Sequence, residues 1–111
     1  MPIEKWSDSI IIVHLSGDPH LGEHLQAASD EVAQRAVDVV LDFGAIRYVN
    51  SSHIARLLKL RKAVLSAGSR LVLCSVDTQV WGAFLVTGLD KIYDFHDSVP
   101  TALASLQIAR T

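Results

Sequence analysis

Apolar residues along this chain follow two different spacings. Short runs with strand-like apolar residues occupy positions 3–6, 10–15, 37–43 and 70–74, and such runs are typical of strands. Between these runs, apolar residues recur every three or four positions, which favours helices that bury one side. The alternation of the two patterns predicts an α/β fold.

Four helices follow from the second spacing. They cover residues 21–32, 52–66, 77–86 and 98–109, with Gly68 ending the second helix and Pro100 in the first turns of the last. We expect residues 7–9 to form a turn that makes the first two strands a hairpin, and residues 92–93 to form a short last strand. We expect one domain over residues 1–111, with a mixed β-sheet of four to five strands and about four helices mainly on one side.

Composition narrows the function classes. The 111 residues are half apolar, enough for one buried core. The net charge of −2 offers no broad basic surface for nucleic acid. A single cysteine excludes an internal disulfide and fits a reducing compartment. There is no charged leader and no apolar run near the roughly 20 residues of a membrane helix, so we expect a cytoplasmic protein without membrane insertion.

Two adjacent serines, Ser51 and Ser52, stand between a buried strand and a helix. A serine in this position can cap the helix. It can also carry a phosphate, which would sit at the positive end of the helix dipole beside free backbone amides. From these residues alone, both a cap and a phosphorylation switch stay open.

The sequence around the serines resembles the STAS domain family of bacterial anti-sigma factor antagonists. One block reads Val-Val-Leu-Asp-Phe at 39–43 and Tyr-Val-Asn-Ser-Ser-His-Ile-Ala-Arg-Leu-Leu at 48–58. A second block, Ala-Gly-Ser-Arg-Leu-Val-Leu-Cys at 67–74 with Thr-Gly-Leu-Asp at 87–90, is similar to the second half of the family. The resemblance implies a single STAS-like domain.

In that family the switch motif usually reads Asp-Ser-Ser/Thr-Gly, and a partner kinase phosphorylates its second hydroxyl residue. The resemblance therefore implies Ser52 as the phosphorylated residue, with Ser51 as the alternative. Asn50 stands in place of the aspartate and His53 in place of the glycine. Asparagine keeps the ability to cap a helix but loses the negative charge. The His53 ring either blocks an approaching partner or belongs to an interface adapted to it.

The helix after the serines is predicted to be amphipathic. Ile54, Leu57, Leu58, Val64 and Leu65 fall on one side with Leu60 at its border, and Arg56, Lys59 and Lys62 fall on the other. We expect the apolar side to face the sheet and the stem of Arg61 to cover core atoms. The basic residues form either a solvated face or, as the resemblance implies, a partner-binding face.

The turn that precedes the first helix contains Asp18 and His20. Its simple interpretation is a strand-to-helix connection in which Asp18 caps the helix. The resemblance adds that this loop lies near the serine loop. The complete set of partner-binding candidates is Asp18, His20, Asn50, Ser51, Ser52, His53, Arg56 and Lys59.

Catalytic and metal-binding patterns are weak. His20 and His24 have the four-residue spacing of two ligands on one helix, but no cysteine pair or third spaced ligand accompanies them. Ser52 lies next to His53, yet the chain has no Gly-x-Ser-x-Gly motif and no glycine-rich phosphate loop. We expect neither an enzyme nor a metal or cofactor.

The leading functional hypothesis is a regulatory binding protein. With Ser52 unmodified it would sequester an anti-sigma factor that is a serine kinase of the histidine-kinase-like ATPase type, and thereby release a sigma factor. Phosphorylation would end the capture, and a phosphatase would be a further partner. The alternative is a constitutive STAS adaptor, in a signalling complex or a membrane lipid transporter, in which Ser52 is structural.

Overall fold

Five strands lie side by side in the order in which they occur in the chain. The computed structural model describes residues 2–110, with side chains to residue 108. The elements are β1 (Ile3–Lys5), β2 (Ile10–His14), α1 (Leu21–Gln34), β3 (Asp38–Asp42), α2 (Ser51–Ser66), β4 (Leu71–Cys74), α3 (Thr78–Thr87), the 3-10 turn η1 (Leu89–Lys91), β5 (Asp94–His96) and α4 (Val99–Arg110). β1 pairs antiparallel with β2, and the other neighbours are parallel. The α/β fold with a mixed sheet is confirmed.

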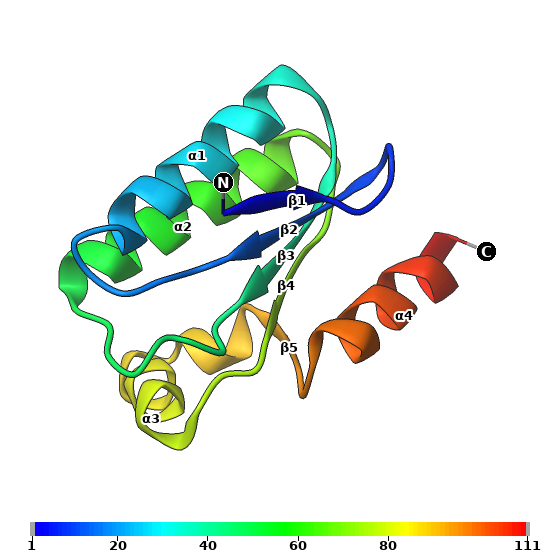
Figure 1. The fold of residues 1–111 in the computed structure, drawn as a ribbon. Helices are drawn as coiled ribbons and strands as arrows, with labels where there is room; N and C mark the ends of the chain where they lie inside the picture. Colours follow the sequence, from blue (N-terminus) through cyan, green and yellow to red (C-terminus); the bar gives the residue numbers. More distant parts are fainter. Residues whose placement is uncertain (1, 111) are drawn as a thin grey trace.

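The two faces of the sheet are covered unequally. Because side chains alternate along a strand, Ile11, Val39 and Leu73 face α1, α2 and α3, while Ile12, Val40 and Val72 face α4. Each crossover between parallel strands moves one place in the same direction, so right-handed connections put their helices on one side. α4 follows the last strand and lies across the sheet from α1 and α2 (Figure 1). The prediction of helices mainly on one side is confirmed.

The buried stripe of α2 differs from the predicted one. Leu57, Leu60 and Val64 are at most 1% exposed, whereas Leu58 is 40% and Leu65 is 56% exposed. The expected burial of Leu58 and Leu65 was therefore wrong, and Leu60 belongs to the core rather than its border. α2 packs on the sheet and also against α1, so its buried stripe follows steps of three and four residues from Leu57.

The predicted last strand at residues 92–93 was also wrong, because β5 begins at Asp94. α3 ends at Thr87, its C-cap Gly88 has a left-handed backbone with φ 75°, and η1 follows directly. Tyr93 then enters the core, where its ring packs at 6.1 Å from Phe84 and 6.5 Å from Phe95 between ring centroids. The sequence therefore suggested a strand at Tyr93 because the residue is apolar and buried, although it lies in the core outside the sheet.

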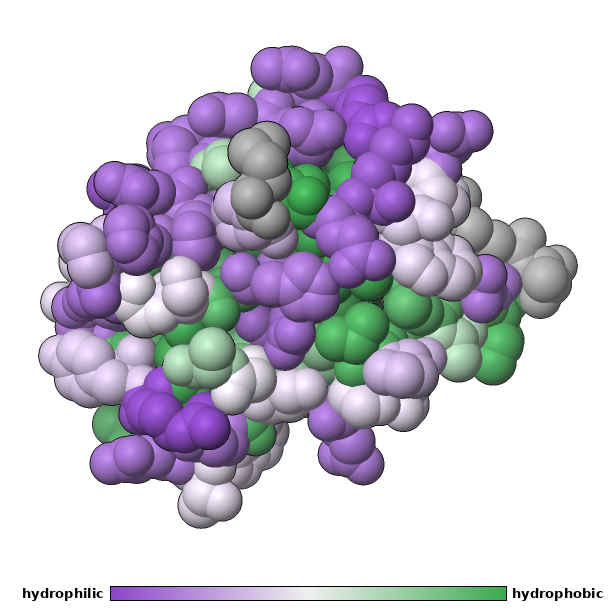
Figure 2. Space-filling model, in the orientation of Figure 1, coloured by the Kyte–Doolittle hydropathy of each residue, from purple (hydrophilic) through white to green (hydrophobic). Residues whose placement is uncertain are grey.

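The face of the molecule seen in Figure 2 is mostly polar. Figure 2 shows hydrophilic residues over α1 and hydrophobic colour along the junction between the sheet and α4. Among the described residues, no helix has both the length and the apolar character needed to cross a bilayer.

Candidate functional site

The loop between β3 and α2, which leads to the serines, is held in place by hydrogen bonds and by buried side chains. After β3, Asp42 accepts a hydrogen bond from the Gly44 backbone N–H at 2.9 Å, and the guanidinium of Arg47 donates to the Gly44 carbonyl at 2.8 Å. Phe43 and Ile46 are each 1% exposed and anchor the loop in the core. The chain therefore reaches α2 in a defined path, and the serines are not carried by a free loop.

Asn50 caps α2. Its side-chain oxygen accepts from the His53 backbone N–H at 2.9 Å, and its own backbone N–H donates to Nδ1 of His53 at 3.1 Å. This reciprocal pair is a capping box in which histidine takes the place usually held by Glu or Gln. Asparagine thus uses the capping ability expected from the sequence. The serine cap that the sequence also allowed is not formed, because Ser51 is already the first residue of the helix.

His53 also connects α2 to the loop before α1. Its Nδ1 accepts a hydrogen bond, so Nε2 carries the proton and donates to the Asp18 carboxylate at 2.8 Å. The side chain of His53 is buried, with 5% of the residue exposed. The ring therefore faces inward and supports the loop, and neither of its nitrogens is directed at the Ser52 hydroxyl.

Asp18 does not cap α1, so that expectation was wrong. The N-cap residue of α1 is His20, which makes no side-chain capping bond. The carboxylate of Asp18 instead binds the ring of His53 in α2, 35 positions further along the chain. The contact confirms that the loop before α1 lies beside the serine loop.

Ser51 and Ser52 are exposed on the first turn of α2. Within the described part of the chain, neither hydroxyl takes part in a hydrogen bond, and the backbone N–H groups of these two residues have no acceptor. The first amides of a helix carry partial positive charge, so this turn can receive an anion.

Two basic residues of α2, Arg56 and Lys59, lie along α1. Arg56 is exposed, and its side chain passes over Gly22, where an added Cβ atom would come within 3.1 Å of Nε. Lys59 donates from Nζ to the side-chain oxygen of Gln26 at 3.1 Å. Both side chains are therefore displayed on the surface where α1 and α2 meet.

His20 and His24 stack with a ring-centroid separation of 6.0 Å. The Nδ1 atom of His24 accepts a hydrogen bond from the Ser16 backbone N–H at 3.3 Å. Burial, with a contribution from His20, lowers the pKa of His24. In the region that the structure describes, no group of three or more His, Cys, Asp or Glu side chains is placed to hold a metal ion.

Sequence reasoning missed one exposed residue of this region. Tyr48 is 65% exposed and its ring lies edge-on to that of His53, with centroids 6.4 Å apart. A tyrosine in a loop gives no periodic signal, but a large aromatic residue just before a candidate motif is a common feature of binding surfaces. We define the serine surface as the exposed residues Asp18, His20, Tyr48, Ser51, Ser52 and Arg56.

Comparisons with known proteins agree with this architecture. The family model described as "Mlab, STAS domain" matches residues 4–99. An anti-sigma F factor antagonist from Paenibacillus polymyxa is 28% identical over 103 residues, covering 89% of this chain and 88% of that protein.

Solved structures share the fold at lower identity. The phosphorylated form of the Bacillus cell fate determinant SpoIIAA matches with a TM-score of 0.71 and 19% identity, covering 93% of this chain and 95% of that one. A sulfate transporter family protein from Wolinella succinogenes matches with a TM-score of 0.82 and 16% identity, covering 95% and 91%. With a family model that spans most of its length, this chain belongs to the STAS domain family.

Proposed function

We propose that this protein is a phosphorylation-controlled antagonist of an anti-sigma factor. With Ser52 unmodified it binds the anti-sigma factor through the serine surface and so releases a sigma factor. The curated relative from Paenibacillus polymyxa, an anti-sigma F factor antagonist, supports this class of function. The proposed partner is a serine kinase of the histidine-kinase-like ATPase type, and a phosphatase resets the switch.

The main support for the proposal is that the Ser52 hydroxyl is accessible and makes no hydrogen bond in the described part of the chain. It is therefore open to a kinase. The residue occupies the second position of α2, beside backbone amides that lack an acceptor. A phosphate there would be stabilised by the helix dipole and would leave α2 folded.

The switch would then act on the surface rather than on the fold. Phosphorylation adds up to about two negative charges and three acceptor oxygens. Arg56 lies one helical turn after Ser52, at the spacing that allows an ion pair with the phosphate. A partner that binds the neutral Ser52 hydroxyl and an unpaired Arg56 would lose both contacts. It would also meet new negative charge on the first turn of α2.

The remaining candidate residues support this surface in different ways. Asn50 and His53 hold the first turn of α2 through their reciprocal hydrogen bonds, and Asp18 connects His53 to the loop before α1. Lys59 extends the basic edge of α2 along α1. We propose that Asn50 and His53 position the first turn of α2, and that the six residues of the serine surface contact the partner.

The second candidate is a constitutive adaptor. It is favoured by the capping box of Asn50 and His53, which keeps the first turn in place without the negative charge that the family motif usually has. In this version the same surface binds a partner permanently, in a signalling complex or a membrane lipid transporter, and Ser52 carries no phosphate.

Intact-mass analysis of the protein isolated from its own cells, with fragmentation to locate any phosphate, separates the two candidates. A phosphate confined to Ser52 supports the switch. An unmodified protein across growth and stress conditions supports the adaptor and contradicts the switch.

A binding experiment completes the test. Affinity is measured for the histidine-kinase-like ATPase encoded nearest to this gene. The switch requires that Ser52→Ala binds like the parent protein while Ser52→Asp loses binding by about tenfold or more, equivalent to about 1.4 kcal/mol. Ser66→Asp, at the exposed far end of α2, is the control for added charge and should bind like the parent protein. Equal binding by all variants would argue against the switch.

A further inference from the structure

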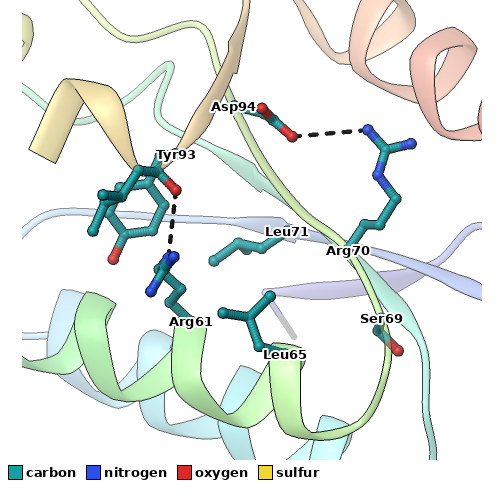
Figure 3. A pocket seen from close by; sticks show the side chains of 8 residues that line it. Arg61, Leu65, Ser69, Arg70, Leu71, Tyr93 and Asp94 are labelled. Atoms are coloured by element: carbon teal, nitrogen blue, oxygen red, sulfur yellow. Dashed lines mark hydrogen bonds and ion pairs between the residues drawn. The ribbon is translucent and has the colours of Figure 1, made fainter.

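The amino ends and the carboxyl ends of β4 and β5 each border a cavity. At the amino ends, Figure 3 shows the side chains of Arg61 and Arg70 on opposite sides of Leu71, so no single ligand group reaches both. The cavity at the carboxyl ends is larger, about 280 Å³, and half-open to solvent. In open α/β sheets, ligands bind outside the carboxyl ends of the strands. The second cavity is therefore the stronger candidate for a binding site.

Two aromatic rings form one wall of this cavity. It is lined by Val76, Trp81, Phe95, His96 and Asp97. The ring centroids of Trp81 and Phe95 are 4.8 Å apart, and the ring planes are nearly perpendicular at 89°. Phe95 also packs on the buried ring of Phe84 at 5.2 Å, which anchors the wall in the core. Trp81 and Phe95 each keep part of their surface exposed, so the cavity has an aromatic wall in a fixed position.

Asp97 supplies an exposed carboxylate to the same lining, which contains neither Lys nor Arg among the described residues. Within residues 2–108 this carboxylate forms no ion pair or hydrogen bond. The nearby Asp77 differs, because it accepts from the Val80 backbone N–H at 2.9 Å and lies 3.7 Å from Nε of Arg47. Asp77 thus already occupies the positive end of α3. The negative charge of Asp97 has no such partner.

The carboxylate and the aromatic wall can be reached by one small molecule. Phe95 and Asp97 are two positions apart at the end of β5. Side chains at this spacing in an extended chain lie on one side, about 7 Å apart. Both residues line the one cavity, and the Trp81 ring lies directly against Phe95. A ring joined to a charged group by a short chain therefore spans the distance.

The turn that brings Val76 to the cavity has a strained backbone. Ser75, directly after β4, has φ 59°, in the left-handed region that residues other than glycine rarely adopt. Its backbone N–H donates to the His96 carbonyl at 3.2 Å, which fixes the turn against β5. Strained residues of this kind cluster at ligand-binding and catalytic sites. The strain is a second observation that points to the carboxyl ends of β4 and β5.

We propose that the cavity at the carboxyl ends of β4 and β5 binds a small organic cation. Its ammonium group pairs with the Asp97 carboxylate, and its apolar part packs on Val76 and on the rings of Trp81 and Phe95. Among aromatic side chains, tryptophan attracts cations most strongly, so Trp81 and Asp97 favour the same charge. An engineered cavity of about 150 Å³ holds benzene, so this larger cavity accepts one ring with a short amine chain. The proposal does not depend on phosphorylation of Ser52.

The test is a titration of the ¹⁵N-labelled, unmodified protein followed by NMR near neutral pH. The probe is 2-phenylethylamine, which is positively charged there, and 2-phenylethanol is the neutral control of similar size. We expect saturable shifts of the Val76 and Asp97 amides and of the Trp81 indole N–H, with the Ser52 and Leu71 amides unchanged. The alcohol should bind about fivefold weaker or less tightly still, because it lacks the ion pair and the cation–π contact. Absence of saturable shifts with the amine in the millimolar range, or equal binding of amine and alcohol, would overturn the proposal.

Variants locate the binding groups. Asp97→Asn changes an exposed residue and should weaken 2-phenylethylamine by about threefold or more while leaving 2-phenylethanol unchanged. Asp90→Asn removes a carboxylate of η1 that lies outside the lining, and this control should bind the amine like the parent protein. Trp81→Leu should weaken both probes, because the aromatic wall serves both, and the dispersion of its spectrum reports whether it is folded. Equal effects of Asp97→Asn and Asp90→Asn on the amine would show that the cavity has no cation site.

Discussion

Nε2 of His53 donates a 2.8 Å hydrogen bond to the carboxylate of Asp18 and joins the first turn of α2 to the loop before α1. Through its other nitrogen the same ring accepts from the Asn50 backbone. One buried side chain therefore holds the two loops whose exposed residues form the serine surface.

His53→Ala should lower the free energy of unfolding by about 2–3 kcal/mol, because it removes two hydrogen bonds and leaves a cavity. The measurement is urea unfolding of the purified variant. His20→Ala, in which an exposed ring is lost, is the control and should change stability by less than about 0.5 kcal/mol. Equal effects of the two substitutions would mean that the His53 network contributes nothing to stability.

Asn50→Ala should cost about 1 kcal/mol, since the His53 backbone N–H loses its acceptor at the start of α2. Asn50→Asp keeps an acceptor of the same shape and restores the residue that the family motif usually has. It should retain most of the stability that Asn50→Ala loses. Thermal unfolding monitored by circular dichroism compares the two variants directly, and similar losses in both would contradict the role of Asn50 as a cap.

His14 should make stability depend on pH. Its ring bridges Glu4 at 2.8 Å and Asp42 at 2.9 Å, and the hydrogen bonds to Glu4 and then Asp42 raise the pKa of His14 in the folded protein. The stabilisation is therefore complete only below the unfolded pKa of about 6.5, and it is lost as pH rises through the higher folded value.

The variant His14→Gln should accordingly lose about 0.5–1 kcal/mol near pH 6, the range of exposed ion pairs, and less near pH 9. Urea unfolding at both pH values measures the difference. His20→Gln is the control, because its ring connects no strands. A cost for His14→Gln that is the same at both pH values would contradict the bridge.

Cys74 should resist alkylation in the folded protein. Burial, with a contribution from Asp42, raises the pKa of its thiol to about 11, and the side chain is fully buried. Iodoacetamide at about pH 8 should therefore modify it only after unfolding in urea. The double variant Cys74→Ala with Ser66→Cys puts a thiol at an exposed position and should react quickly without urea. Fast labelling of the native parent would indicate local opening of β4.

Periodicity predicted most of the fold but not the contacts of the site. Alternating apolar runs identified four of the five strands near their observed places, because a buried strand must be apolar. The error at residues 92–93 arose because Tyr93 is buried outside the sheet. In α2, the exposed Leu58 and Leu65 could not be distinguished from core leucines without knowing where α1 lies.

The candidate site was located by its motif, but its construction was not predictable. No local pattern reports a hydrogen bond between Asp18 and His53, because the two residues are far apart in the chain. The spacing of Asn50 and His53 matches that of a capping box, yet histidine is an unusual partner in it. Tyr48 gave no signal because a single exposed residue has no period.

The position of α4 has a consequence for synthesis. The apolar residues that it covers on β2, β3 and β4 are made before α4 itself, since α4 follows these strands in the chain. While the chain is still being translated, the other helices can already pack on their side of the sheet, but Ile10, Ile12 and Val40 have nothing to cover them. The growing chain therefore exposes an apolar surface until α4 is made and packs on it, and until then it is most open to chaperones and to aggregation.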